Sequence, residues 1–197
     1  LNEIEKMDIV LPPKSPIRAE EVRHYAGKNR EHKPWDLPPA VARKEIAAAA
    51  GILKNLFDFN IAAIQILHAL GDHFMRLLRL KLYFKEHPKD LEQAKRLSRA
   101  GFKGKDELNP LLAQAANDSG YASRSLRPNS VYNQMTLPRV LDQMENFTLE
   151  QFSYIIRLLA TADSDLKSGL MPDSAFAMER LILYIAYSGQ YRAPTRF

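Results

Sequence analysis

Between Thr148 and Gly189, hydrophobic and polar residues alternate at the spacing of α-helices. In the first half of this stretch the apolar residues recur every three or four positions and form one stripe, which predicts an amphipathic helix: Phe152, Ile155, Ile156, Leu159, Ala162 and Leu166. Ser153, Arg157, Ser164 and Asp165 fall outside the stripe. A helix with a single apolar stripe needs one packing neighbour.

Local signals mark both ends of this first helix. Thr148-Leu149-Glu150-Gln151 has the form of a capping box, and Phe147 and Phe152 stand at the two positions of a hydrophobic staple. The helix is predicted to end near Ser168, because Gly169 can take the left-handed conformation that closes a helix.

A second helix, Ser174 to Tyr187, has two apolar faces. Ala175, Met178, Ile182 and Ile185 mark one face, Phe176, Leu183 and Tyr187 mark the other, and Leu181 and Ala186 lie between them. A helix that is apolar nearly all round is buried on more than one side. Two interpretations follow: the helix is the centre of this chain's own core, or one face meets another subunit.

The chain from Pro38 onward is also predicted to be helical. We expect one helix over Pro38–Asp58 and a longer one that Asn60 caps and Pro88 closes. The core stripe expected in the longer helix comprises Ile64, Leu67, Leu70, Phe74, Leu77, Leu78 and Leu82. A shorter basic helix runs from Asp90 to Arg99. The short loops between these helices predict antiparallel packing.

Residues 101–138 are rich in turn signals, among them Asn109-Pro110. Helical pieces are predicted only around 111–116 and, beyond the turns, 140–145. No alternation long enough for a strand occurs, so the predicted fold is all-α. A polar, charged linker at 28–33 predicts two units, residues 1–33 and a helical bundle over 34–197, with Trp35 as a packing anchor.

Composition limits the classes of protein that fit. The chain has no cysteine, which excludes disulfides and thiolate zinc sites. No apolar run reaches the roughly 18 residues needed to span a membrane, and the N-terminus does not resemble a signal peptide. We therefore expect a cytoplasmic protein without membrane contact. Because the chain begins with Leu1 and not Met, we expect a fragment of something longer.

The net charge of +5 is concentrated in one stretch. The stretch from Arg76 to Lys105 contains ten basic and three acidic residues, which gives it a net charge of +7. Such a stretch is a candidate contact for DNA phosphates or an acidic partner, although a solvated helix face is the commoner explanation. The candidate residues are Arg76, Arg79, Lys81, Lys85, Lys95, Arg96 and Arg99.

Catalytic motifs are not found in the sequence. The stretch Gly101–Lys105 lacks the spacing of a phosphate-binding loop. His68 and His73 lie five residues apart, which on a helix does not bring them together on a metal, and His68 with Asp72 is typical of a surface pair. Asp163 and Asp165 point in different directions on their helix. We expect no catalytic residue, no cofactor and no metal.

Several motifs spread along the chain resemble those of one known family. Asn2-Glu3-Ile4-Glu5-Lys6-Met7 at the start of the chain resembles the N-E-[IL]-E-K-L segment in the lid domain of the delta subunit of bacterial DNA polymerase III, the clamp-loader family, and residues 17–22 resemble the segment that follows it there. Trp35-Asp36-Leu37 is similar to the entry into the family's last domain, and residues 66–79 to its L-L-x-x-L-x-x-x-F-R-x-L-L-R helix. Residues 162–169 resemble A-D-x-x-[IL]-K-x-G, and residues 178–183 resemble L-E-x-L-[IL]-L. Arg18 departs from the family's hydroxyl cap, and nothing transfers onto 101–138.

The resemblance implies the end of a helical AAA+ lid domain, followed by a helical-bundle collar domain. The collar would assemble with ATP-binding gamma/tau-like and delta-prime-like subunits, would meet DNA only through the full complex, and would reach the sliding clamp only through a missing N-terminal domain. The expected subunit interface comprises Phe176, Glu179, Arg180, Leu183 and Tyr187. The alternatives are a stand-alone helical DNA-binding or protein-interaction module and, less favoured, a small helical enzyme.

Overall fold

The computed structural model describes residues 32–100, 104–118 and 139–188. Of these residues 83% are helical, and they contain no strand, so the predicted all-α fold is confirmed. The chain divides into two units, Leu1–His32 and Lys33–Phe197. The predicted end of a lid domain falls almost wholly outside the described residues, and everything below concerns the second unit.

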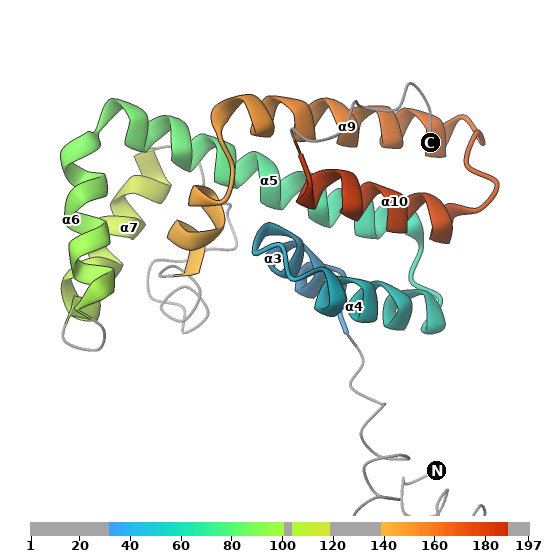
Figure 1. Ribbon diagram of the computed structural model, residues 1–197, viewed down its shortest axis with the longest axis horizontal. Helices are drawn as coiled ribbons and strands as arrows, with labels where there is room; N and C mark the ends of the chain where they lie inside the picture. Colours follow the sequence, from blue (N-terminus) through green and yellow to red (C-terminus); the bar gives the residue numbers. More distant parts are fainter. Residues whose placement is uncertain (1–31, 101–103, 119–138, 189–197) are drawn as a thin grey trace, which may run out of the picture. The chain divides into compact units, whose positions relative to one another are not determined.

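The longest helix, α5 (Ala63–Glu86), is the element against which most of the others pack. Helix α9 (Leu149–Lys167) lies along it and runs in the opposite direction, as Figure 1 shows. Helix α10 (Ser174–Ala186) then packs against α9, α4 and α3. The remaining elements are η1 (Pro34–Asp36), α3 (Leu37–Ala42), α4 (Ile46–Asp58), α6 (Pro88–Arg99), α7 (Lys105–Asp118) and a helical segment at 139–145.

The prediction of a single helix over Pro38–Asp58 is wrong, because the chain turns between α3 and α4. Lys44 takes a left-handed conformation with φ 61°, and its N–H donates to the carbonyl of Val41 at 2.9 Å. Asn60 (φ 56°) ends α4 in the same way, donating to Phe57 at 2.9 Å. Asn60 therefore closes one helix and does not cap the next, whose N-cap residue is Ala62.

The predicted ends of α9 are confirmed in detail. The Thr148 hydroxyl accepts a hydrogen bond from the Gln151 N–H at 3.2 Å, and the Gln151 side-chain oxygen accepts from the Thr148 N–H at 2.7 Å. The rings of Phe147 and Phe152 lie 5.5 Å apart and are buried. At the other end Gly169 is left-handed with φ 70°. These local contacts fix where α9 begins and ends.

The burial pattern of α5 differs from the predicted stripe. Leu82 is exposed, and Ile64 and Leu78 are only partly buried. Positions outside the predicted stripe are buried instead: Ala63, Ile66, Leu80 and Phe84. The prediction of a single buried stripe is wrong because α5 packs against helices on more than one side: η1, α3, α6, α7, α9 and α10.

Helix α9 likewise buries more than one stripe. Leu158 and Asp165, both outside the predicted stripe, are buried, whereas Ile156 and Leu166 are only partly buried. Helix α9 packs against both α5 and α10, so the expectation of one neighbour is wrong.

The predicted turn at Asn109-Pro110 is also wrong, because both residues lie inside α7. Gly104, just before α7, is packed so closely that a Cβ there would lie 2.2 Å from the carbonyl oxygen of Leu97. This glycine serves helix packing between α6 and α7. The predicted helix at 140–145 is confirmed, and its described part covers 139–145.

Polar contacts tie this 139–145 segment to the bundle. His73 Nε2 lies 2.8 Å from Gln143 Oε1, and the Asn146 amide donates to the carbonyl of Ala42 at 2.9 Å. Since an amide oxygen only accepts, His73 donates this bond from Nε2. Burial lowers the pKa of His73 to about 4. Neighbouring Arg76 and Arg43 lower it as well, whereas the bond to Gln143 and the charge of Asp72 oppose that change.

The free energy of unfolding should therefore fall as the pH drops from about 6.5 toward 4. In this range the unfolded chain protonates His73 while the folded chain keeps it neutral, so each pH unit costs up to about 1.4 kcal/mol. Urea unfolding followed by circular dichroism between pH 7.5 and 4.5 measures the change. A His73→Gln variant should lose less stability over this range; two parallel curves would contradict the assignment.

Candidate functional site

Helix α10 has one face in the core and one face exposed. Its buried residues are Ala177, Met178, Leu181, Ile182, Ile185 and Ala186, and they pack where α10 meets α9, α4 and α3. Phe176 is 58% exposed, Leu183 42% and Tyr187 43%. The two faces predicted for this helix are thus distinct, and one of them is left uncovered by the described residues.

The start of α10 sets which residues point outward. The Asp173 side chain accepts a hydrogen bond from the Phe176 N–H at 3.0 Å, which caps the helix and places Phe176 in its first turn. Leu183 and Tyr187 follow seven and eleven positions later, on the same side of the helix. We call Phe176, Arg180, Leu183 and Tyr187 the α10 outer stripe.

Arg180 lies between two aromatic rings of its own helix. Its guanidinium carbon is 5.9 Å from the ring centre of Phe176 and 5.9 Å from that of Tyr184, within the range of cation–π contacts. Arg180 is partly buried, while Glu179 beside it is exposed. The predicted interface residues therefore lie on or beside one surface, but their role as an interface stays a prediction.

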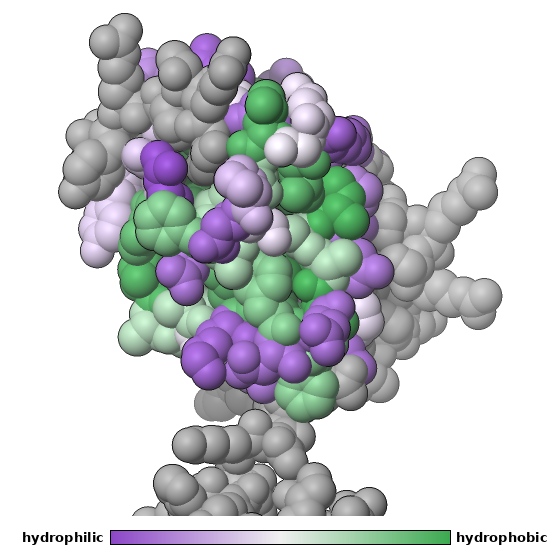
Figure 2. All heavy atoms as spheres, turned by 90° about the vertical axis from the view of Figure 1, so that its right-hand side faces the viewer, coloured by the Kyte–Doolittle hydropathy of each residue, from purple (hydrophilic) through white to green (hydrophobic). Residues whose placement is uncertain are grey.

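One end of the bundle also exposes apolar side chains. Phe59 follows α4 and is 42% exposed; Leu170 lies between α9 and α10 and is 46% exposed. These helix ends lie at the same end of the bundle in Figure 1. Figure 2 views that end and shows hydrophobic residues gathered between hydrophilic ones. Phe59 and Leu170 were not predicted from the sequence, since a single apolar residue after a helix carries no periodic signal.

Trp35 does not act as the predicted packing anchor. Its side chain is 59% exposed, whereas Leu37, two residues later, is fully buried. Leu37 begins α3 and takes the buried position at this point of the chain.

The structure does not gather the seven candidate cations into one free surface. Arg76 forms an ion pair with Asp72, Lys95 with Glu145, and Lys81 donates to the carbonyls of Met144, at 3.1 Å, and Phe147. Lys85, Arg96 and Arg99 are exposed, and Arg79 is exposed with a contact inside the chain. Contact of these residues with DNA or an acidic partner stays a prediction.

Lys81 has a structural role that the sequence did not reveal. Its ammonium group binds carbonyl oxygens at the end of the 139–145 segment, where the negative end of the helix dipole lies. Burial lowers the pKa of Lys81, nearby Glu145 raises it, and Lys95 lowers it. No pattern in the sequence pairs a lysine with carbonyls more than sixty residues away.

Lys81→Met should lower the free energy of unfolding by about 2 kcal/mol, because two carbonyl oxygens lose a charged donor. The matched change Lys85→Met, at an exposed lysine four residues along the same helix, should stay within about 0.5 kcal/mol. Urea unfolding of both variants measures the difference. Equal effects would mean that Lys81 acts only as a surface charge.

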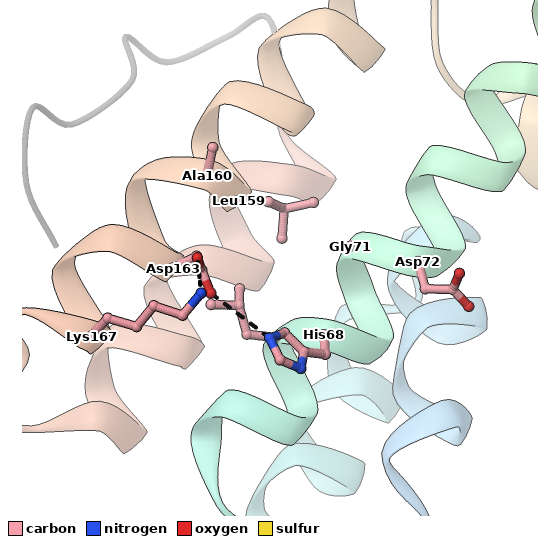
Figure 3. Close-up of a pocket in the computed structure, with 8 residues that line it drawn as sticks. His68, Gly71, Asp72, Leu159, Ala160, Asp163 and Lys167 are labelled. Atoms are coloured by element: carbon pink, nitrogen blue, oxygen red, sulfur yellow. Dashed lines mark hydrogen bonds and ion pairs between the residues drawn. The ribbon is translucent and has the colours of Figure 1, made fainter.

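A shallow groove of about 330 Å³ lies between α5 and α9, lined by Leu67, His68, Gly71, Asp72, Leu159, Ala160, Asp163 and Lys167. Asp163 stands between Lys167, whose Nζ is 2.6 Å from it, and His68, whose Nε2 is 3.9 Å away, as Figure 3 shows. Asp72 points away from His68 in that view, so the expected His68–Asp72 pair is wrong.

The groove offers ion pairs but no catalytic arrangement. The Asp163 carboxylate is shared by Lys167 and His68, and Asp72 is paired with Arg76. No hydroxyl or thiol nucleophile lines the groove. Across the described ranges, no three acidic or histidine side chains are grouped closely enough to hold a metal ion. None of the described helices combines the length and hydropathy that crossing a membrane requires.

Comparisons with known proteins identify no relative. No protein family, no curated protein and no solved structure matches this chain. The geometry of α10 therefore carries the functional proposal.

Proposed function

We propose that the second unit, residues 33–197, is a helical subunit-assembly domain that docks onto a neighbouring subunit through the outer stripe of α10. The observation that carries this proposal is the exposure of Phe176, Leu183 and Tyr187 on one side of a helix whose other side is buried. Exposed apolar and aromatic residues grouped on one surface mark interaction sites.

The anchoring of α10 to the bundle supports this role. The helix is capped by Asp173, and its inner face is buried against α9, α4 and α3. Little conformational entropy would be lost when a partner meets a surface already held in place. Aromatic residues on such a surface favour binding because they bury a large area with few rotatable bonds.

We further propose that the assembly is a clamp-loader complex and that this chain is a delta-like, non-catalytic subunit of it. The support is the resemblance of residues 162–169 and 178–183 to delta-subunit motifs. The first of these segments holds the last turns of α9 with the cap at Gly169; the second forms the middle of α10. The second therefore lies in the helix that carries the α10 outer stripe, and the first lies in the helix that packs against it.

In this proposal the partners are ATP-binding gamma/tau-like and delta-prime-like subunits of a cytoplasmic complex. The sliding clamp would be bound by a separate N-terminal domain, and DNA by the whole assembly. The groove between α5 and α9 has no catalytic part in this function.

A Leu183→Asp variant tests the proposal, because a buried carboxylate at the centre of the stripe would oppose docking. The full chain is mixed with purified ATP-binding clamp-loader subunits and separated by size-exclusion chromatography without DNA. Wild-type protein should co-elute, whereas Leu183→Asp should bind at least tenfold more weakly, about 1.4 kcal/mol.

Leu82→Asp is the matched control, since Leu82 is 44% exposed on α5 and Leu183 is 42% exposed on α10. Leu82→Asp should co-elute like wild type, and both variants should keep wild-type helicity and melting temperature. If Leu183→Asp lost helicity, its face would belong to the core. If the wild-type chain bound DNA but no subunit, the chain would be a stand-alone DNA-binding module.

A further inference from the structure

We infer that Arg180 determines which partner the α10 outer stripe accepts, by receiving a carboxylate from an apolar surface of the neighbouring subunit. This inference rests on the proposed function and names the chemistry of the partner. It assigns one occupant to the surface: an apolar protein surface with an Asp or Glu side chain among its apolar residues.

Arg180 lies within the α10 outer stripe, beside two aromatic rings. Phe176, Arg180 and Tyr184 follow one another at four-residue steps, so their side chains are neighbours on the helix surface. The guanidinium carbon lies 5.9 Å from both ring centres. Two flanking rings restrict the conformations of a long side chain, so less entropy is lost when its donors bind a partner.

No acidic side chain among the described residues pairs with Arg180. Five other cations there have acidic partners: Arg43, Lys54, Arg76, Lys95 and Lys167. Arg180 has its two ring contacts and no ion pair among the described residues. The acidic residue of α10, Glu179, lies one position away and so about 100° round the helix, where it does not face Arg180.

Docking of a partner would desolvate the charge of Arg180. Arg180 lies between Phe176 and Leu183 along the stripe, so a partner that covers these two side chains also removes water from the guanidinium. A desolvated charge without an opposite charge opposes binding strongly. A partner that covers the stripe therefore binds more tightly if it supplies an anion.

A protein carboxylate fits this surface better than a phosphate does. Phe176, Leu183 and Tyr187 need apolar side chains against them, which a nucleic-acid backbone does not offer. The planar guanidinium binds a carboxylate through two parallel hydrogen bonds, so the contact selects a partner by geometry as well as by charge.

The inference is tested with the full chain and purified ATP-binding clamp-loader subunits. Arg180→Gln should raise the Kd at least tenfold and flatten its dependence on salt. Arg180→Lys, which keeps the charge but loses the paired donors, should recover only part of the affinity. All variants should keep the wild-type melting temperature.

Arg157→Gln is the matched control, because it removes the same charge from an exposed position on α9. Its Kd should stay within twofold of wild type. Equal weakening by Arg157→Gln and Arg180→Gln would overturn the inference in favour of general electrostatic attraction.

The remaining outcomes separate this inference from the proposed function. If Leu183→Asp abolished binding while Arg180→Gln bound like wild type, the docking surface would stand and the role of Arg180 would be refuted. A wild-type chain that bound none of these subunits would overturn the proposed function and this inference together.

Discussion

The packing of α9 along α5 is the interaction on which the rest of the bundle depends. Phe74 of α5 meets Phe147 and Phe152, with ring centres 5.6 and 6.4 Å away, and all three rings are buried. Phe147 and Phe152 flank the capping box of α9, so the same residues start the helix and attach it to α5. The position of α9 is therefore set at its first turn.

The exposed stripe of α10 follows from this arrangement. At the end of α9 the Leu170 N–H donates to the backbone carbonyl of Asp165 at 2.9 Å, and the Gly169 N–H donates to that of Leu166 at 3.3 Å. These bonds close the helix and redirect the chain. Helix α10 then lays one face against α9, α4 and α3. Because α10 is also apolar on its opposite face, Phe176, Leu183 and Tyr187 stay exposed there, with none of the described helices packed over them.

The sequence predicted those features that local contacts determine. The ends of α9 were predictable because cap, staple and glycine all lie within a few residues of each end. The break between α3 and α4 at Lys44 could not be predicted, since lysine seldom takes a left-handed conformation. The two faces of α10 were visible as periodicity. The roles of Lys81 and Lys95 were not, because their partners at 144–147 are distant in sequence.

Hydrogen exchange of the full chain, with and without ATP-binding clamp-loader subunits, tests most directly whether α10 is the docking surface. The amides of Ser174–Ala186 should exchange more slowly in the complex, while those of Pro88–Arg99 in the basic helix α6 should be unchanged. Slower exchange confined to α6, with α10 unaffected, would contradict assembly through the α10 outer stripe.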